Sequence, residues 1–311
     1  MAESNDSFCF RPVNHYEVKD ALENLNTRKA IGYEGSSASI VEEKLLSEGS
    51  KITEWYKENL LQVNVQKYQS MLMDSGTEAK NSINLHKDLT DIERSKSIKL
   101  LGVLLDSELN FSEHITLVFK KTSRHIGVLS RLRKLIPTYA KLQLYKAAIL
   151  PHLTYCSTIW HFCRASDKRK AERLQERALR VVFNDKSLSY DGLLKLAEIP
   201  SLVNRRLQDI AILMFKAKKN LLPCQIQELF MSEVNCDRRY SLRNADFRIP
   251  RFNTVKYGKH SIRYYGPLLW SKLTKELRSE ESLHAFKSKI RRTDMTVMID
   301  DGCKKCALCN S

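Results

Sequence analysis

Residues 166–183, with the sequence SDKRKAERLQERALRVVF, decide the class of fold. Apolar residues recur every three to four positions along this stretch, which is the period of an α-helix with one face in a core. Either Ser166 or Asp167 is suited to cap its start. The apolar face holds Ala171, Leu174, Ala178 and Val181, and the opposite face holds Arg169, Arg173, Arg177 and Arg180. The stretch therefore predicts one helix of a bundle, because other helices must cover its apolar face.

Further helices of this kind are predicted on both sides. Two of them end at Pro137 and Pro151, because proline has no backbone N–H and its ring clashes within a helix. The chain after Leu221 is expected to be less regular up to a last helix. These predicted helices cover residues 115–136, 138–150, 201–219 and 281–292.

The first 115 residues have a mixed pattern. Aliphatic runs predict two strands, over residues 65–73 and 97–106, with a polar segment between them. Amphipathic spacing predicts helices over residues 14–27, 38–47 and 52–62. The expected class is α+β and predominantly helical.

Positive charge is concentrated in one part of the chain. The net charge of the 311 residues is +16, of which residues 1–120 contribute −5 and residues 121–311 contribute +21. Such asymmetry favours a polyanionic partner, with RNA or DNA ahead of an anionic membrane surface. A basic protein without a specific partner is the alternative.

The composition excludes several classes of protein. No apolar run is long enough for a membrane span, and the start MAESNDSFCF is unlike a secretion signal. We therefore expect an intracellular protein, in the nucleus or the cytoplasm, whose eight cysteines are reduced thiols.

Two groups of residues are candidates for binding nucleic acid. The arginines at 169, 173, 177 and 180 suit phosphate oxygens, although Glu172 and Glu176 could neutralise a merely solvated face. The second group mixes cations with aromatic rings, as proteins that bind single strands do, although these rings could equally form a small core. Trp160 and Trp270 in particular are expected in a core. The second group comprises Arg248, Arg251, Lys256, Tyr257, Lys259, Arg263 and Tyr264.

Several strings, taken in order, resemble the reverse transcriptase of non-LTR (LINE-type, jockey- and CR1-like) retrotransposons. FRPVNHYEVKDALENLNTRKAIGYEG (residues 10–35) resembles the opening of that domain, with Glu34 where the family usually has aspartate. ITEWYKENLLQVNVQKYQSMLM (52–73) resembles the segment after the catalytic strand. SIKLLGVLLDSELNFSEHI (97–115) resembles the primer-grip hairpin, with Leu101 and Gly102 as its primer-grip-like residues. PHLTYCSTIW, RLQERALRVVFND and NRRLQDIAILMFK resemble the thumb region.

The resemblance implies four segments. Residues 1–47 would be a remnant of the fingers and residues 48–115 a remnant of the palm with its hairpin. Residues 116–220 would form a thumb-like bundle, and residues 221–311 a basic aromatic C-terminal segment.

The same resemblance exposes a gap. Family members hold magnesium with aspartates that lie between the K-A-x-G loop and the E-W-x-x-N helix, where two metal ions carry out the reaction. Here Gly35 is followed within twenty residues by Trp55, which leaves no room for them. We therefore expect no cofactor for this chain. Lys67 falls on the lysine of polymerase motif D and is interpreted as vestigial.

Two other motifs could hold metal. Asp300-Asp301 superficially resembles the missing aspartate turn, but no partner strand with a third carboxylate precedes it. Cys303, Cys306 and Cys309 have a spacing that can ligate zinc, yet three thiolates are one ligand short, so free thiols are the favoured interpretation.

Three functional hypotheses remain open. The chain is a retroelement remnant that binds nucleic acid without polymerase activity, a mis-spliced form of an active reverse transcriptase, or a binding or interaction module that the host has adopted. An in-frame aspartate-coding stretch in the genomic DNA between codons 35 and 55 would favour the second.

Overall fold

The computed structural model describes residues 47, 49–62, 64, 67–71, 85–87, 90–92, 95–230 and 246–297. The chain divides into two compact units, one of Met1–Leu72 with Gly76–Ser95 and one of Met73–Ser75 with Lys96–Ser311. The described elements are mostly helices with two short antiparallel sheets, which confirms the predicted α+β, predominantly helical class. Among these residues, no helix is long and apolar enough to cross a membrane.

The first unit contains helical residues 49–58, near the helix predicted over 52–62. Strands β1 (Leu85–Lys87) and β2 (Thr90–Ile92) pair antiparallel inside the segment that was expected to be a polar connection. The helix predicted over 14–27 lies outside the described residues, as does the one over 38–47 except for its last residue.

The strand predicted over residues 65–73 is wrong in its described part. Residues 67–71 contain no strand, only an isolated bridge at Ser70. Of the backbone bonds described there, one is local, from the Lys67 N–H to the Asn64 carbonyl (3.0 Å), and one runs from the Ser95 N–H to the Ser70 carbonyl (2.8 Å). A strand needs a continuous ladder of such bonds, and an aliphatic run alone does not supply the partner.

The second unit begins with a hairpin. Strands β3 (Ser97–Leu100) and β4 (Val103–Asp106) pair antiparallel, with Leu100 opposite Val103. The segment is thus a hairpin, as the resemblance implied, and not the continuous strand that its aliphatic content predicted. Leu101 and Gly102 both have positive φ, 46° and 87°, which is the backbone of the tight two-residue turns that match the twist of paired strands.

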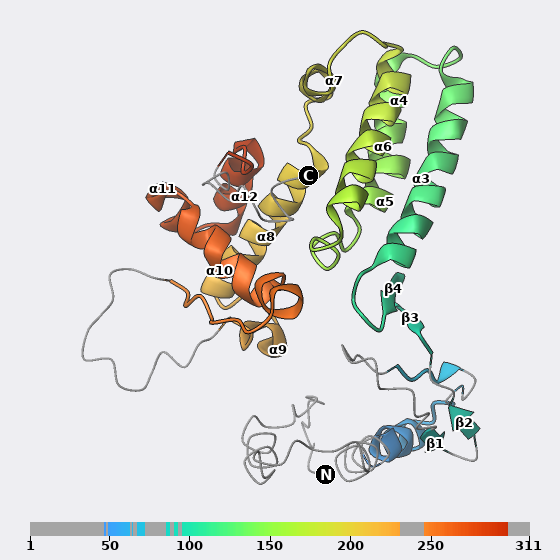
Figure 1. The fold of residues 1–311 in the computed structure, drawn as a ribbon, viewed down its shortest axis with the longest axis vertical. Helices are drawn as coiled ribbons and strands as arrows, with labels where there is room; N and C mark the ends of the chain where they lie inside the picture. The colour runs from blue at the N-terminus through green and yellow to red at the C-terminus, as the bar shows by residue number, and fades with distance from the viewer. Residues whose placement is uncertain are drawn as a thin grey trace, which may run out of the picture. The chain divides into compact units, whose positions relative to one another are not determined.

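The arginine-rich helix over residues 166–183 belongs to a bundle (Figure 1). Helix α6 (Ala165–Phe183) packs against α3 (Ser112–Leu132) and α4 (Thr138–Leu144), and α3 also contacts α5 (Leu150–Thr154). Helix α7 (Tyr190–Ala197), which was not predicted, packs against α6. The core between these helices is largely aliphatic and includes Ile126, Leu129, Ile149, Leu153, Ala171, Leu179, Val182 and Leu193.

Three predicted helix boundaries are wrong. Helix α3 ends at Leu132, four residues before the predicted end at Ile136, because the chain turns at 133–135 before it reaches Pro137. Helix α6 begins at Ala165, so Ser166 and Asp167 lie in its first turn, where Asp167 faces the positive end of the helix dipole instead of capping it. The helix predicted to stop at Pro151 continues through the π-helical turn η2 (Tyr145–Ile149) into α5. Pro151 directly follows this π-helical turn, where the regular α-helical bonding pattern is already interrupted, so the helix tolerates its missing N–H.

Helix α8 (Leu202–Lys218) leads into a second core. It packs against α10 (Ile262–Lys272) and α12 (Leu283–Arg292), so the chain after Leu221 is more helical than predicted. Trp160 and Trp270 are 2% and 1% exposed, which confirms both as core residues. Short helices α9 (Cys224–Gln227) and α11 (Lys275–Arg278) also belong to this part. The division of the chain into four segments stays a prediction.

Candidate nucleic-acid interface

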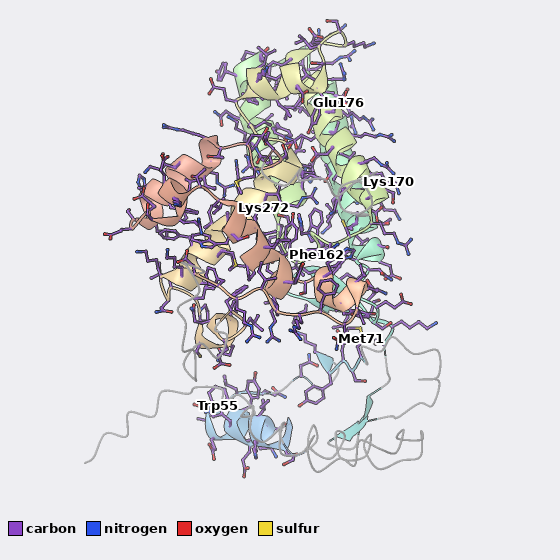
Figure 2. The ribbon with its side chains drawn as sticks, turned by 60° about the vertical axis from the view of Figure 1, so that its left-hand side comes forward. Trp55, Met71, Phe162, Lys170, Glu176 and Lys272 are labelled. Atoms are coloured by element: carbon purple, nitrogen blue, oxygen red, sulfur yellow. The ribbon has the colours of Figure 1, made fainter. Side chains whose placement is uncertain are left out.

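The arginine face of α6 is the first part of the candidate interface. Arg169, Arg173 and Arg177 are exposed and lie about one helical turn apart, opposite the buried Ala171 and Ala178. Within the described ranges, no ion pair joins any of the three to an acidic residue. Figure 2 marks this helix by Lys170 and Glu176. The three guanidinium groups are therefore available to bind an anion.

The two glutamates of α6 make other contacts. Glu172 accepts hydrogen bonds from the backbone N–H groups of Leu202 (3.2 Å) and Val203 (2.7 Å) at the start of α8, and from the Tyr190 hydroxyl. A carboxylate at the N-terminus of a helix satisfies donors that have no partner inside the helix. Glu176 pairs with Arg180 at 2.7 Å. Neither glutamate is described in a pair with the three exposed arginines.

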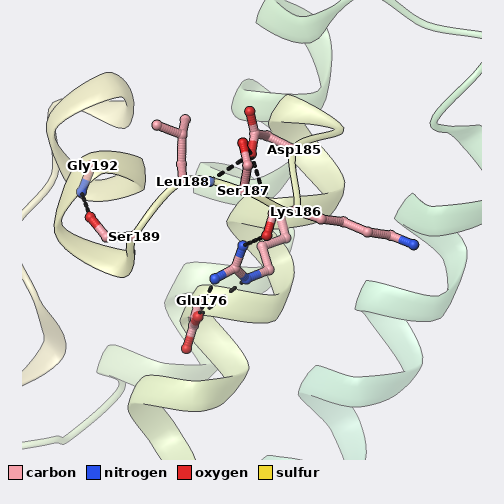
Figure 3. A network of polar contacts seen from close by, with 8 residues as sticks. Glu176, Asp185, Lys186, Ser187, Leu188, Ser189 and Gly192 are labelled. Atoms are coloured by element: carbon pink, nitrogen blue, oxygen red, sulfur yellow. Dashed lines mark hydrogen bonds and ion pairs between the residues drawn. The ribbon is translucent and has the colours of Figure 1, made fainter.

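Arg180 has a different environment from the other three, because it contacts Glu176 and the loop that holds Asp185 and Lys186. Figure 3 shows that loop and Glu176. The Nη1 of Arg180 donates to the carbonyl of Lys186 (3.0 Å), so Arg180 ties the end of α6 to the following loop. In that loop, Asp185 accepts from the N–H groups of Ser187 (2.6 Å) and Leu188 (2.8 Å), and these bonds, led by that of Leu188, lower the pKa of its carboxyl. The contacts of Arg180 thus serve the loop, and its predicted role in phosphate binding stays a prediction.

Two hollows border the arginine face. The smaller, about 310 Å³, is lined by Arg169, Arg173 and Lys168 of α6 among others. The larger, about 640 Å³, lies between the end of β4, the residues around Phe162 and the π-helical turn η3 (Val255–Lys259). Ala165 lines both, so the arginine face starts beside the larger pocket. That pocket has mostly apolar walls and three basic side chains, Arg164, Lys256 and His260.

The C-terminal wall of the larger pocket is attached to the loop after β4. Lys256 pairs with Glu108 at 3.1 Å, and the Tyr257 hydroxyl donates to the Glu108 carbonyl at 3.5 Å. Hydrogen bonds from Asn110 first, and then from Lys256, lower the pKa of the Glu108 carboxyl. The His260 ring lies parallel to that of Phe162, with centroids 6.3 Å apart. Segments 148 residues apart in sequence therefore share one pocket.

The other predicted residues of the C-terminal segment differ in accessibility. Arg248, Arg251 and Arg263 are exposed, and Lys259 is half-buried. Tyr264 packs edge-on against Phe252, with centroids 4.9 Å apart, whereas Tyr257 remains 41% exposed. Part of the aromatic content therefore serves packing, and Tyr257 offers an accessible ring.

The tip of the hairpin is held by a contact from the bundle. The Tyr155 hydroxyl donates to the carbonyl of Leu101 at 2.6 Å, and a Cβ added to Gly102 would lie 3.5 Å from the Tyr155 ring. The Leu101 side chain is 85% exposed. This geometry presents an apolar tip on a fixed backbone, and its role as a primer grip stays a prediction.

The predicted metal and motif residues lie mostly outside the part of the chain that the structure describes. Lys67 is exposed in a short turn. Asp300, Asp301 and the three cysteines at 303, 306 and 309 fall beyond the described residues. In the ranges that are described, no three or more His, Cys, Asp or Glu side chains gather as metal ligands would.

Sequence reasoning missed Phe162, Arg164, Lys168 and His260. Phe162, Arg164 and Lys168 lie within seven residues of one segment, but His260 comes close to them only in the folded chain, so no spacing in the sequence identifies the four together. Lys168 is a partial exception, since it directly precedes the arginine face.

The chain is similar over part of its length to a transposon protein. A stretch of 95 residues, 29% of the chain, is 30% identical to a protein described as "Probable RNA-directed DNA polymerase from transposon X-element" of Drosophila melanogaster. The match covers 10% of that relative's length. No family model and no solved structure matches the chain. The similarity supports a relation to transposon reverse transcriptases.

Proposed function

We propose that this chain is a non-LTR retrotransposon reverse transcriptase that has lost its polymerase core and binds the backbone of RNA or DNA with little regard to sequence. The observation that carries the binding proposal is the exposed face of Arg169, Arg173 and Arg177 beside a pocket with mostly apolar walls. The similarity to a transposon RNA-directed DNA polymerase supports the origin.

The spacing of the three arginines suits a phosphate backbone. Four residues of α-helix rise about 6 Å, which is comparable to the distance between successive phosphates in an extended single strand. Guanidinium groups bind phosphate oxygens through two parallel N–H donors. A backbone that follows α6 towards Ala165 would reach the larger pocket, where Tyr257 and the apolar walls could receive an unstacked base.

The loss of polymerase activity rests on the sequence between Gly35 and Trp55. Nineteen residues separate them, too few for the strands that carry the catalytic aspartates of the family. Two-metal chemistry needs several converging carboxylates on a rigid frame. The basic helical region, by contrast, lies after this gap and keeps its cores.

The binding proposal is tested with the full chain and a fluorescent single-stranded RNA over a series of salt concentrations. We expect the logarithm of the binding constant to fall linearly with the logarithm of salt concentration. Replacing Arg169, Arg173 and Arg177 together with glutamine should reduce the slope by about 2, because each lost phosphate contact contributes about 0.7 for single strands.

The matched control is Lys275, Lys287 and Arg292 replaced together with glutamine, since these exposed cations of α11 and α12 give the same change in net charge. The control should leave the slope nearly unchanged. A flat salt response of the natural chain would remove the nucleic-acid proposal. Equal effects of the two triple variants would show general attraction and no site on α6.

The proposed loss of activity has its own test. Primer extension on an RNA template, with magnesium or manganese, should give no product above that of a no-enzyme control. Reproducible extension that disappears on removal of the metal would refute it.

A further inference from the structure

Two histidines from different helices of the bundle point their ring nitrogens at each other. His125 lies on α3, and His152 lies on α5. Their Nε2 atoms are 3.2 Å apart, and their ring centroids are 4.9 Å apart with the planes tilted by 35°. His125 is exposed and His152 is half-buried, so solvent reaches the pair. The nucleic-acid interface on α6 does not use either residue.

We propose that His125 and His152 form a binding site for a transition-metal ion of the zinc, nickel or copper type, which links α3 to α5. Imidazole nitrogens ligate such ions at about 2.0–2.1 Å, and two of them on a tetrahedral ion stand about 3.3 Å apart. The observed separation of 3.2 Å matches that value. An ion therefore fits between the rings without a movement of either helix.

The chemistry of the pair selects the class of ion. Imidazole suits zinc, copper and nickel, whereas calcium and magnesium take oxygen ligands. Without a metal, one ring keeps a proton on Nε2 and donates it to the other ring. When the ion binds, this ring changes tautomer: its proton passes through solvent from Nε2 to Nδ1, the ring stays neutral, and the Nε2 lone pairs of both rings ligate the metal.

Water completes the coordination. No third protein ligand joins the two histidines within the described ranges. A hollow of about 150 Å³ beside His152 has room for water molecules. Two protein ligands with open positions make an exchangeable site, unlike the closed four-ligand sites that hold structural zinc.

Two lysines that line the hollow beside His152, Lys99 and Lys121, oppose the ion. Lys121 lies four residues before His125 on α3 and lines the same hollow as His152. Residues four apart on a helix share a face, so its ammonium group is close enough to repel a divalent cation. Removal of the Lys121 charge should therefore strengthen metal binding, so the site can be tested by a substitution that raises the affinity.

The experiment titrates Ni²⁺ into the full chain by calorimetry, without a polyhistidine tag and with Cys303, Cys306 and Cys309 replaced by serine to remove competing thiolates. We expect one saturable equivalent. His125→Gln and His152→Gln should each weaken binding at least about tenfold, since each removes one of two ligands. His284→Gln, an exposed histidine on α12, should leave it unchanged.

The Lys121→Gln variant should bind Ni²⁺ about two- to threefold more tightly, a gain that a folding defect cannot produce. Equal Ni²⁺ affinity in the natural chain and the two ligand variants would overturn the proposal. The proposal also fails if His284→Gln weakens binding as much as they do, or if Lys121→Gln weakens it.

Discussion

The guanidinium group of Arg206 lies over the ring of Trp160, with its central carbon 5.0 Å from the ring centroid. Both side chains are 2% exposed, and burial lowers the pKa of Arg206 from its ordinary high value. The Arg206 Nε donates to the Leu202 carbonyl, while its two Nη atoms have no hydrogen-bond partner among the described residues. The face of the indole therefore stabilises a charge that would otherwise be costly to bury.

This stacking can be measured by a double-mutant cycle. Trp160→Leu, Arg206→Met and their combination should give a coupling free energy of about 2 kcal/mol in denaturant unfolding, the size of a desolvated cation–π contact. Arg206→Met alone should cost little, because a methionine of similar length needs no hydrogen bonds. Additive effects of the two substitutions would contradict the assignment.

The stability of the protein should fall in mildly acidic solution. His161 is buried, and this burial first, followed by the charges of Lys168 and Arg206, holds its pKa well below the ordinary 6.5. Below about pH 6.5 the unfolded chain binds a proton at His161 that the folded chain does not, so the free energy of unfolding decreases as pH falls. The full contribution of neutral His161 is present above about pH 7.

Between pH 7.5 and 5.5 the expected loss from His161 is about 1 kcal/mol in urea unfolding. His161→Phe keeps ring contacts with Phe162 and Tyr265 and should flatten this pH dependence. A small dependence should remain, since burial also lowers the pKa values of His114 and His260. An unchanged slope in His161→Phe would contradict the prediction.

Arg180 should affect folding more than binding. Arg180→Gln removes the bonds to Glu176 and to the Lys186 carbonyl, so we expect a loss of about 1 kcal/mol and faster amide exchange in the loop after α6. Its RNA affinity should change less than that of Arg173→Gln, which in turn should keep full stability. If Arg180→Gln lowered RNA affinity more than Arg173→Gln and lowered stability less, Arg180 would belong to the binding interface.

The turn of the hairpin should require glycine. Gly102→Ala places a side chain at φ +87°, a conformation that L residues rarely adopt, and should cost about 1 kcal/mol or more. Tyr155→Phe removes the bond to the Leu101 carbonyl and should increase amide exchange at the tip while leaving the bundle unchanged. Equal protection from amide exchange at the tip in the natural chain and in Tyr155→Phe would show that the Tyr155 bond does not hold the tip.

Periodicity predicted the long helices well because each buries one continuous apolar face. Helices α8 and α12 begin and end within two residues of the predicted bounds, and α6 ends at the predicted Phe183. The pattern failed where local rules and packing disagree. Gly266 and Pro267 look like helix breakers, yet both lie inside α10, and a Cβ on Gly266 would come within 2.6 Å of the Met214 sulfur. Close approach of α10 to α8 explains this glycine, and no local pattern reveals it.

Only the part of the candidate site that lies on a single helix could be predicted from the sequence. The exposed arginines follow from their spacing, because one helix face fixes their mutual position. The fate of Glu172 did not follow, since its partners Leu202 and Val203 lie 30 and 31 residues further along the chain. The larger pocket and the His125–His152 pair also depend on segments that meet only through tertiary packing.

The π-helical turn Tyr145–Ile149 determines the direction in which the side chains of the following helix α5 point. A π turn amounts to an α-helix with one extra residue, so removing one residue there would rotate α5 by about 100° about its axis. His152 and Tyr155 would then swing away from His125 and from the hairpin together. The extra residue of the π turn is thus required for both contacts, that of His152 with His125 and that of Tyr155 with Leu101. A deletion or insertion at this point would break both.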